Sequence, residues 1–274
     1  MTTRENATLN ERPKKLLGII GAGHMAGALA RGWGEPILAT DGGSGRAAKL
    51  VAELGGEALH SNADLAARAD VILLGHKPHQ LESIARQIDA SGKMVISVLG
   101  PTKIADLQRA YPKSQIVRVM PNTPVAIRRG VSCIAEGGEA AVELFERVGR
   151  VFVLPESQMD LATATIGVTP AYVAVIAEAM IDAAVIHGLP VSLASEMTLA
   201  VLSGAAELIR TRGGDTLFAR REVGSPGEST VRGVAALERG GIRATFEDAT
   251  RSVLERLSLP YEGKPVLSSI ARGR

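Results

Sequence analysis

The stretch Leu16-Leu-Gly-Ile-Ile-Gly21-Ala-Gly23-His24-Met25-Ala26-Gly27 combines a short apolar run, a glycine-rich turn and the first residues of a helical pattern. Its G-x-G-x-x-A spacing is typical of a loop that binds the pyrophosphate of a dinucleotide. Gly21 permits a tight turn, Gly23 lets the backbone approach the phosphates, and the helix directs its first N–H groups at the anion. A turn with a purely structural role is the alternative, but the flanking strand and helix favour dinucleotide binding.

Further apolar runs alternate with helical patterns through the first half of the chain. The sequence predicts strands over 16–20, 37–40, 71–74, 94–98, 116–120 and 151–154, and helices over 25–33, 46–54, 81–88, 104–110 and 139–148. This alternation predicts a Rossmann-type α/β fold with a doubly wound, mostly parallel sheet over residues 15–160. The apolar runs are continuous, as expected for strands covered on both faces. The polar residues 1–14 are expected to form a flexible N-terminal arm.

The pattern changes after Asp160, where strand signals stop and helical patterns rich in Ala, Leu and Val begin. We expect helices over 171–187, 192–212, 230–239 and 243–257, with Ser192 as the N-cap of the second. Residues 161–274 are therefore predicted to form an all-α domain. Its helices are apolar on several faces, which predicts burial against a second copy in a homodimer. A compact monomeric bundle is the alternative.

Composition excludes several classes of protein. The 31 Lys and Arg residues nearly balance the 29 Asp and Glu residues, giving a net charge of +2, so neither a nucleic-acid partner nor a membrane surface is expected. The apolar segment 161–190 carries Glu178 and Asp182, which are costly in lipid, so we interpret it as a buried helix. The single cysteine, Cys133, excludes an intrachain disulfide and fits a cytoplasmic location.

Two features of the segment after residue 40 point to different nicotinamide cofactors. Asp41 ends the second predicted strand, where a carboxylate usually binds the ribose 2′-hydroxyl of NAD(H). Ser44 and Arg46 follow within a glycine-rich stretch and could instead hold the 2′-phosphate of NADP(H). Both NADP(H) and NAD(H) therefore stay open.

Three further stretches carry polar groups at positions where ligands bind. His76-Lys77-Pro78-His79 and Met120-Pro-Asn122-Thr-Pro124 each follow a predicted strand, at the carboxyl edge of the sheet. The two histidines lack a third ligand, so no metal site is expected. The turn from Val223 to Thr230 contains Ser225, Gly227 and Ser229 and leads into a helix, so its N–H and hydroxyl groups suit a carboxylate. Simple N-capping by Ser229 is the alternative.

The order of these motifs resembles pyrroline-5-carboxylate reductase. It comprises the glycine-rich loop, Lys77-Pro78, the stretch from Arg118 to Pro124, Pro170-Ala-Tyr172, Ser225-Pro-Gly227, and Thr230 with a Gly-Val-Ala-Ala-Leu-Glu segment behind it. The resemblance covers roughly residues 15 to 257. It implies NAD(P)H-dependent reduction of a cyclic imine, 1-pyrroline-5-carboxylate, to L-proline. It also implies a dimer through the helical domain, and an active site between the nucleotide domain of one subunit and the helices of two.

The resemblance implies roles for individual residues. Thr230 is the candidate catalytic residue, its hydroxyl bonded to the ring nitrogen, and Ser225, Gly227, Ser229 and Thr230 are the candidate substrate-binding residues. The candidate cofactor-binding residues are Gly21, Gly23, His24, Met25, Asp41, Ser44, Arg46, Asn62, Lys77, Pro78 and Asn122.

Several positions depart from the family pattern. His24 stands where Asn is usual, Gly75-His76 replaces small apolar residues, and 167–169 replaces a Ser-Gly-type turn. Glu228 stands where a second Gly is usual, and its carboxylate would repel the substrate carboxylate unless it points away. Reduction of another cyclic imine is therefore one alternative, and a non-catalytic nucleotide sensor is another.

Two related enzyme classes fit less well. A β-hydroxyacid dehydrogenase needs a catalytic Lys in its helical domain, but no Lys lies between Lys113 and Lys264. An F420-dependent NADP reductase has a similar nucleotide half but does not need the long helical half.

Overall fold

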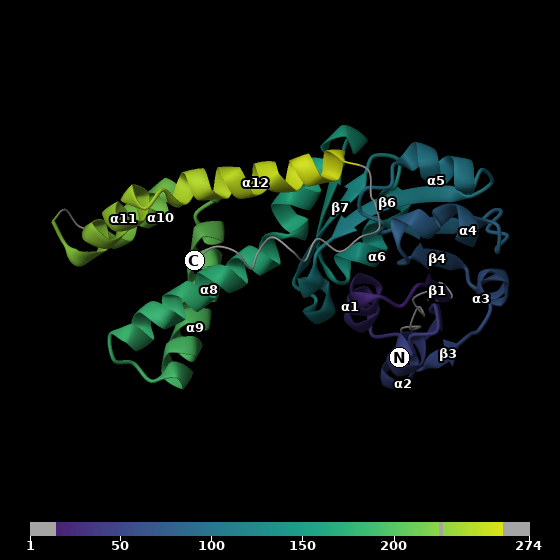
Figure 1. Cartoon of the computed structure of the whole chain (residues 1–274), viewed down its shortest axis with the longest axis horizontal. Helices are drawn as coiled ribbons and strands as arrows, with labels where there is room; N and C mark the ends of the chain where they lie inside the picture. The colour runs from purple at the N-terminus through teal and green to yellow at the C-terminus, as the bar shows by residue number, and fades with distance from the viewer. Residues whose placement is uncertain (1–14, 225–226, 260–274) are drawn as a thin grey trace, which may run out of the picture. The chain divides into compact units, whose positions relative to one another are not determined.

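The structure, a computed structural model, describes residues 15–224 and 227–259. These residues form two compact units, a sheet unit that ends at Gly167 and a helical unit that runs from Val168 to Leu259 (Figure 1). The predicted flexible arm over 1–14 and the C-terminal part of the predicted helical domain, 260–274, lie outside the described residues.

The sheet unit contains eight strands in the order β3-β2-β1-β4-β5-β6-β7-β8. Their bounds are β1 Leu17–Ile20, β2 Ile37–Thr40, β3 Gly56–Ala58, β4 Val71–Leu74, β5 Met94–Ser97, β6 Gln115–Pro121, β7 Gly130–Ala135 and β8 Gly149–Leu154. All neighbouring pairs are parallel except β6 and β7, which are antiparallel. The predicted doubly wound, mostly parallel sheet is confirmed.

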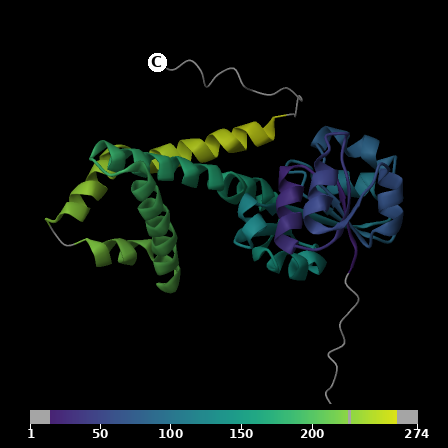
Figure 2. The same cartoon turned by 90° about the horizontal axis from the view of Figure 1, so that it is seen from below.

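Helices cover both faces of this sheet (Figure 2). One face packs against α1 (His24–Trp33), α2 (Arg46–Leu54) and α6 (Val142–Glu146), and the other against α3 (Asn62–Arg68), α4 (Leu81–Ala85) and α5 (Ile104–Ala110). Strands β1, β2 and β4 are buried at every position, which explains their unbroken apolar runs.

The sequence prediction missed two strands, β3 and β7. β3 is the three-residue segment Gly-Glu-Ala, which has no apolar run, and its pairing with β2 makes it a strand. β7 lies between β6 and β8, and its small residues Ser132 and Cys133 are buried there. Both strands are therefore defined by their neighbours in the sheet rather than by local apolar pattern.

The boundary between the units lies after Gly167, whereas the sequence places it at residue 160. A 3₁₀ turn, η4 (Glu156–Gln158), and a short α-helix, α7 (Met159–Ala162), belong to the sheet unit. Met159 and Ala162 are buried there against β6 and β7. An ion cluster holds the same segment. The buried guanidinium of Arg118 on β6 bonds to Glu156 and Asp160, each at 3.1 Å, and Lys103 bonds to Asp160 at 2.7 Å.

The helical unit comprises α8 (Thr169–Ile186), α9 (Val191–Thr211), α10 (Thr216–Val223), α11 (Ser229–Arg239) and α12 (Ile242–Ser258). The all-α character predicted for this half is confirmed for its described part, although α10 was not predicted. The N-cap of α9 is Pro190 rather than Ser192, because the helix already begins at Val191. Tyr172 on α8 packs edge-on against Phe246 on α12, with 6.3 Å between ring centroids.

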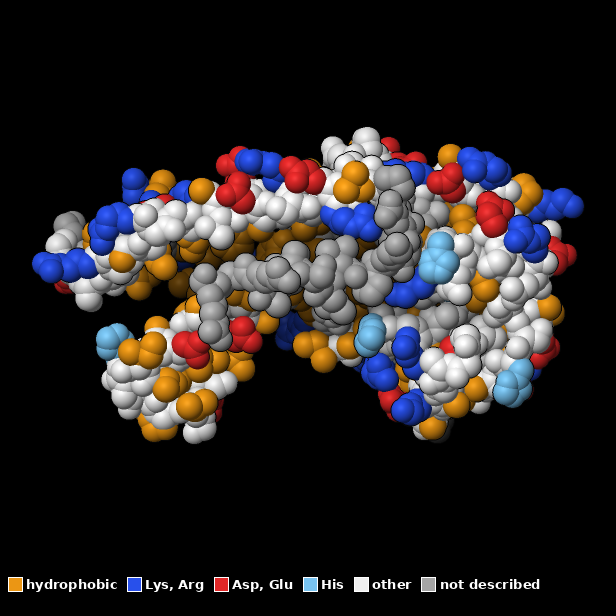
Figure 3. Space-filling view, viewed as in Figure 1, with side chains coloured by type: hydrophobic (Ala, Val, Ile, Leu, Met, Phe, Trp, Pro, Cys, Tyr) orange, Lys and Arg blue, Asp and Glu red, His pale blue; other side chains and the backbone are white. Residues whose placement is uncertain are grey.

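Much of the apolar surface of this unit is exposed. Val175 and Ile186 on α8 are 63% and 80% exposed, and Leu199 and Val201 on α9 are each 57% exposed. In Figure 3, hydrophobic side chains gather over the end of the α8–α9 pair. Two segments, Glu156–Ile186 and Val191–Thr211, are long and apolar enough to cross a membrane by length and composition alone. The described residues therefore leave these apolar faces largely uncovered, as is typical of surfaces that pack against a partner.

Two glycines on α1 provide a test of how tightly the sheet unit is packed. A Cβ at Gly32 would lie 2.1 Å from the Val125 carbonyl oxygen, whereas one at Gly27 would meet only the flexible end of Arg31, at 3.3 Å. We expect Gly32→Ala to lower the free energy of unfolding by about 1–3 kcal/mol through overpacking. Gly27→Ala should change it by less than about 1 kcal/mol, because Ala favours the helix. Thermal unfolding of both variants checks this, and equal losses would contradict it.

Candidate functional site

A cleft opens at the carboxyl edge of the sheet where the strand order reverses, with β1 between β2 and β4. Ligands of doubly wound sheets bind at this reversal. The cleft has a volume of about 740 Å³, within the range of small-molecule and cofactor sites. Its lining residues are Ile20, Gly21, Ala22, Gly23, Thr40, Asp41, Gly42, Arg46, His60, Ser61, Asn62, Ala63, Gly75, His76, Lys77, Gln80, Ser83, Ile84 and Gln87.

The floor of the cleft is a backbone contact between the glycine-rich loop and the end of β4. Gly21 has a φ of +92°, and a Cβ there would lie 2.5 Å from the His76 amide nitrogen. A Cβ on Gly23 would make ordinary contacts with the Gly75 and Gly21 carbonyl oxygens, at 3.5 and 3.9 Å. Gly21 is therefore required by the packing of the protein itself, while Gly23 leaves room for a ligand beside the first turn of α1.

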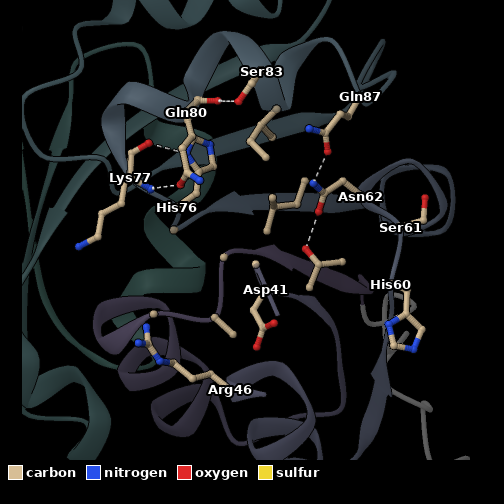
Figure 4. Close-up of a pocket in the computed structure, with 18 of the residues that line it drawn as sticks. Asp41, Arg46, His60, Ser61, Asn62, His76, Lys77, Gln80, Ser83 and Gln87 are labelled. Atoms are coloured by element: carbon tan, nitrogen blue, oxygen red, sulfur yellow. Dashed lines mark hydrogen bonds between the residues drawn. The ribbon is translucent and has the colours of Figure 1, made fainter. Parts of the chain in front are cut away.

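A chain of hydrogen bonds crosses one wall of the cleft (Figure 4). The Thr40 hydroxyl donates to Asn62 Oδ1 at 2.6 Å, and Asn62 Nδ2 donates to Gln87 Oε1 at 2.7 Å. The three residues come from β2, α3 and the segment after α4, so these hydrogen bonds link the end of a strand to two separate crossover connections of the sheet. They fix the Asn62 side chain in one orientation within the cleft.

The segment after β4 is held by its own side chains. The Lys77 amide donates to Gln80 Oε1 at 3.0 Å, and His76 Nδ1 lies 2.9 Å from the Lys77 carbonyl oxygen. Because a carbonyl only accepts, Nδ1 carries the proton. Burial lowers the pKa of His76, and its Nε2 is buried with no hydrogen-bond partner among the described residues. His76 is therefore a neutral imidazole that shapes the cleft wall.

Asp41 is bound within its own loop. One carboxylate oxygen accepts hydrogen bonds from the Gly43 and Ser44 amides at 2.8 and 3.1 Å, and the other accepts from the Ser44 hydroxyl and the Ala47 amide at 3.1 and 2.8 Å. These bonds, led by that from Ala47, lower the pKa of Asp41. The carboxylate points away from Asn62 (Figure 4).

A smaller hollow of about 150 Å³ adjoins the cleft and shares Gly23 and Arg46 with it. It lies between α1 and α2 and is lined by the basic side chains of His24, Arg31, Arg46 and Lys49. Its one acidic residue, Glu53, is bound by Arg31 through two hydrogen bonds of 2.6 and 3.0 Å. The hollow is therefore suited to an anion.

The structure brings together some of the residues that the sequence predicts for the cofactor. Gly21, Gly23, Asp41, Arg46, Asn62 and Lys77 line the cleft, and His24 lines the smaller hollow.

Four others lie elsewhere. Met25 packs against the core, Ser44 bonds to Asp41, and Pro78 lines a separate surface hollow. Asn122 pairs β6 with β7, because its side-chain oxygen accepts from the Val131 amide at 2.8 Å. Their roles as cofactor ligands stay predictions.

The sequence prediction missed several polar residues of the cleft, among them His60, Ser61, Gln80, Ser83 and Gln87. A local signal existed for Ser61, which caps α3 by accepting from the Asp64 amide at 3.2 Å. Gln80 and Gln87 gave no such signal, since their positions depend on how α4 and its flanking turns pack beside β4.

The turn predicted to hold the substrate lies at the start of α11. Ser225 lies outside the described residues, Gly227 has a φ of +84° and is exposed, and Thr230 is half-buried in the first turn. Glu228 is the N-cap residue, but its side chain forms no capping hydrogen bond. Ser229 lies inside the helix, so the alternative of N-capping by Ser229 is wrong. The Glu228 side chain therefore leaves the first N–H groups of α11 able to bind an anion.

The cleft suits a dinucleotide by its shape and its donors. It combines a glycine-rich loop ahead of a ten-residue helix, an open approach beside Gly23, and polar side chains at the ends of β2 and β4. Within residues 15–224 and 227–259, no three His, Cys, Asp or Glu side chains gather in a way that could hold a metal ion.

Comparisons with known proteins agree with this geometry. Residues 16–101 match the family described as NADP oxidoreductase, coenzyme F420-dependent, and residues 156–258 match the family described as pyrroline-5-carboxylate reductase dimerisation. The pyrroline-5-carboxylate reductase of Synechocystis is 34% identical over 204 residues, which cover 71% of this chain and 76% of that protein. That of Glycine max is 31% identical over 257 residues, 88% of this chain and 94% of that protein.

A solved structure shows the same architecture. The pyrroline carboxylate reductase of Plasmodium falciparum, solved with NADP bound, superposes with a TM-score of 0.79 at 27% identity, covering 89% of this chain and 97% of that one. The glycine-rich cleft agrees with the matches to the Glycine max and Plasmodium falciparum proteins, which extend over nearly the full length of each. The chain belongs to the pyrroline-5-carboxylate reductase family and is an NAD(P)H-dependent oxidoreductase.

Proposed function

We propose that this protein reduces 1-pyrroline-5-carboxylate to L-proline, the last step of proline biosynthesis. The observation that carries the proposal is the N-terminus of α11, which the Glu228 side chain does not cap. Gly227 lies before it and Thr230 in its first turn, inside a segment that matches the family. Open N–H groups at a helix start bind a carboxylate, and a hydroxyl one turn in can reach an atom of the same small ring.

In this proposal the N–H groups before Thr230, with the Ser225 and Ser229 hydroxyls, hold the substrate carboxylate. The Thr230 hydroxyl accepts a hydrogen bond from the protonated ring nitrogen and orients the C=N bond. The nicotinamide cofactor, when bound, supplies the hydride for the imine carbon. The ring nitrogen keeps its proton and becomes the amine, so the chain needs no strong general acid. Because a protonated imine is already electrophilic, positioning provides most of the rate enhancement.

The hydroxyl of Thr230 can be tested with a matched pair of variants. Thr230→Val keeps the shape and removes the hydroxyl, whereas Thr230→Ser keeps the hydroxyl. We expect Thr230→Val to lower kcat/KM about ten- to a hundredfold, as for a lost hydrogen bond to a charged group, and Thr230→Ser to stay close to the parent. The measurement is oxidation of NADPH and NADH with 1-pyrroline-5-carboxylate, followed by absorbance. Unchanged turnover in Thr230→Val would remove the role assigned to this residue, and no turnover in the parent would contradict the function.

Glu228 bears on which imine is reduced. Its carboxylate is exposed at the N-cap and bonds to no N–H group of the helix, so it lies beside the proposed carboxylate site without blocking it by capping. A second candidate function is therefore reduction of a cyclic imine that lacks a carboxylate, for which Glu228 would be neutral or favourable.

We expect Glu228→Gln and Glu228→Gly each to lower the KM for 1-pyrroline-5-carboxylate about fivefold, the effect of removing ~1 kcal/mol of repulsion between two solvated carboxylates. Steady-state kinetics at low salt checks this. Equal KM values in the parent and both variants would show that the side chain points away, and a parent that turns over only a carboxylate-free imine would favour the second function.

We propose further that two copies pair through α8 and α9, since the family matched over 156–258 is a dimerisation family. Among the residues that the structure describes, helix α9 buries Ala194 and Thr198 and leaves Leu199, Val201 and Leu208 exposed. A second copy would cover these faces, which also explains why both helices are long and apolar enough to resemble membrane spans. A cytoplasmic location follows as part of this proposal.

Light scattering after size exclusion, without detergent, should give a mass of at least twice 28.6 kDa. Val201→Glu should lower that mass or the thermal stability by placing a charge in the interface, while Glu207→Gln, an exposed and already polar position on the same helix, should not. A monomer mass for the parent, or recovery in the membrane fraction, would contradict the dimer.

A further inference from the structure

We propose that Arg118 on β6 is a positioning residue for the nicotinamide half of the cofactor. Its buried guanidinium fixes the loop between β5 and α5, residues 98–103, at the carboxyl edge of the sheet. The inference depends on the nicotinamide cofactor of the family and on no particular imine. It gives the ion cluster of Arg118 a role in cofactor binding in addition to anchoring the segment after β8.

The loop over 98–103 lies directly beside the cleft. The Val98 amide donates to the Leu74 carbonyl oxygen at 3.2 Å, and Leu74 leads into Gly75 and His76 of the cleft. The strand order β3-β2-β1-β4-β5-β6 is that of a sheet with two mononucleotide-binding halves, and the half with the glycine-rich loop and β2 takes the adenosine. The nicotinamide half is therefore expected over the ends of β4, β5 and β6, where this loop lies.

The Arg118 side chain reaches the loop from the neighbouring strand. Arg118 pairs with Ser97, the last residue of β5, and its side chain is only 3% exposed. Its Nη2 donates to the Gly100 carbonyl oxygen at 2.9 Å and to Asp160 Oδ1 at 3.1 Å, and its Nη1 donates to Glu156 Oε1 at 3.1 Å. The two nitrogens of one planar group thus join the loop to the segment that follows β8.

The same two carboxylates hold the C-terminal end of the loop. Glu156 Oε1 also accepts a hydrogen bond from the Ile104 amide at 2.6 Å, at the start of α5, and Asp160 Oδ2 accepts one from the Lys103 ammonium at 2.7 Å. Two cations and two carboxylates therefore balance within the cluster. Each carboxylate bridges Arg118 and the loop, so loss of the guanidinium would weaken several of the bonds that hold the loop.

Folding alone does not require an arginine at this position. Burying a guanidinium costs desolvation free energy, and apolar side chains of similar volume are often as stable in place of a buried ion cluster. The core side of the loop is already held by Leu99 and Thr102, which are both buried. An apolar side chain could not bind the Gly100 carbonyl oxygen, however. The arginine is therefore best explained by the position that it gives to the loop.

Binding of NADPH and of 2′-phospho-ADP-ribose to the full-length protein, measured by calorimetry, tests this role, because the two ligands differ by the dihydronicotinamide ring. NADH and ADP-ribose form a second such pair. We expect Arg118→Met to lower the affinity for the reduced cofactor about tenfold relative to the ring-free probe, and Arg118→Lys, which has one nitrogen in place of the fork, to be intermediate. Equal losses for both members of a pair would overturn the proposal, as would equal affinities in the parent.

A compensated variant separates the position of the loop from stability. Arg118→Met alone leaves the carboxylates of Glu156 and Asp160 without their buried partner, so we expect its thermal stability to fall. Adding Glu156→Gln and Asp160→Asn removes the uncompensated charges. This triple variant should recover stability without recovering the affinity ratio.

Arg128→Met is the converse control. It removes the 2.7 Å hydrogen bond from Arg128 to the Gly32 carbonyl oxygen in the last turn of α1, at the opposite edge of the sheet, so stability should fall while the affinity ratio stays at the parent value. An affinity ratio that follows stability across all these variants would leave Arg118 a purely structural role and overturn the proposal. No measurement here uses an imine, so a protein that fails to reduce 1-pyrroline-5-carboxylate can still pass this test, and the reverse also holds.

Discussion

The backbone of Gly21 lies directly against the backbone of Gly75 and His76, and the cleft depends on this contact. A Cβ at Gly75 would lie 2.7 Å from the Gly21 carbonyl oxygen and from the Ala26 Cβ, so neither glycine can carry a side chain without moving β1 away from β4. The contact sets the depth of the glycine-rich loop and the position of the first turn of α1. The N–H groups at that helix start, and the ends of β2 and β4 on either side, then line the candidate cofactor cleft.

The two units differ in how much of their apolar surface the described residues of one chain bury. The sheet unit buries both faces of its central strands under its own helices, and polar groups such as Arg118 find partners inside the unit. The helical unit exposes large apolar side chains along α8 and α9. Because burial of such surface is the main driving force of association, the unit that carries Thr230 is also the one that needs a second copy.

Sequence patterns predicted the elements whose signal is local. The strand over 37–40 and the helices over 46–54 and 104–110 have the expected bounds, since unbroken apolar runs and helical periodicity reflect burial on the element itself. The patterns missed β3 and β7, which become strands only through their partners in the sheet. They also placed the domain boundary at residue 160, because the anchoring of Met159 and Asp160 on β6 involves residues some 40 positions away.

The sequence by itself determined the fold class, the dinucleotide loop and the family, because G-x-G-x-x-A and the later motifs act over a few residues each. Only the tertiary structure decided where side chains point. Asp41 and Arg46 are five positions apart, and by residue type alone they favour opposite cofactors. In the folded chain the Asp41 oxygens are bound by the amides of its own loop, while Arg46 stands unpaired among the described residues at a basic hollow. Orientation and hydrogen-bond saturation are properties of three-dimensional geometry, so no pattern of residue types contains them.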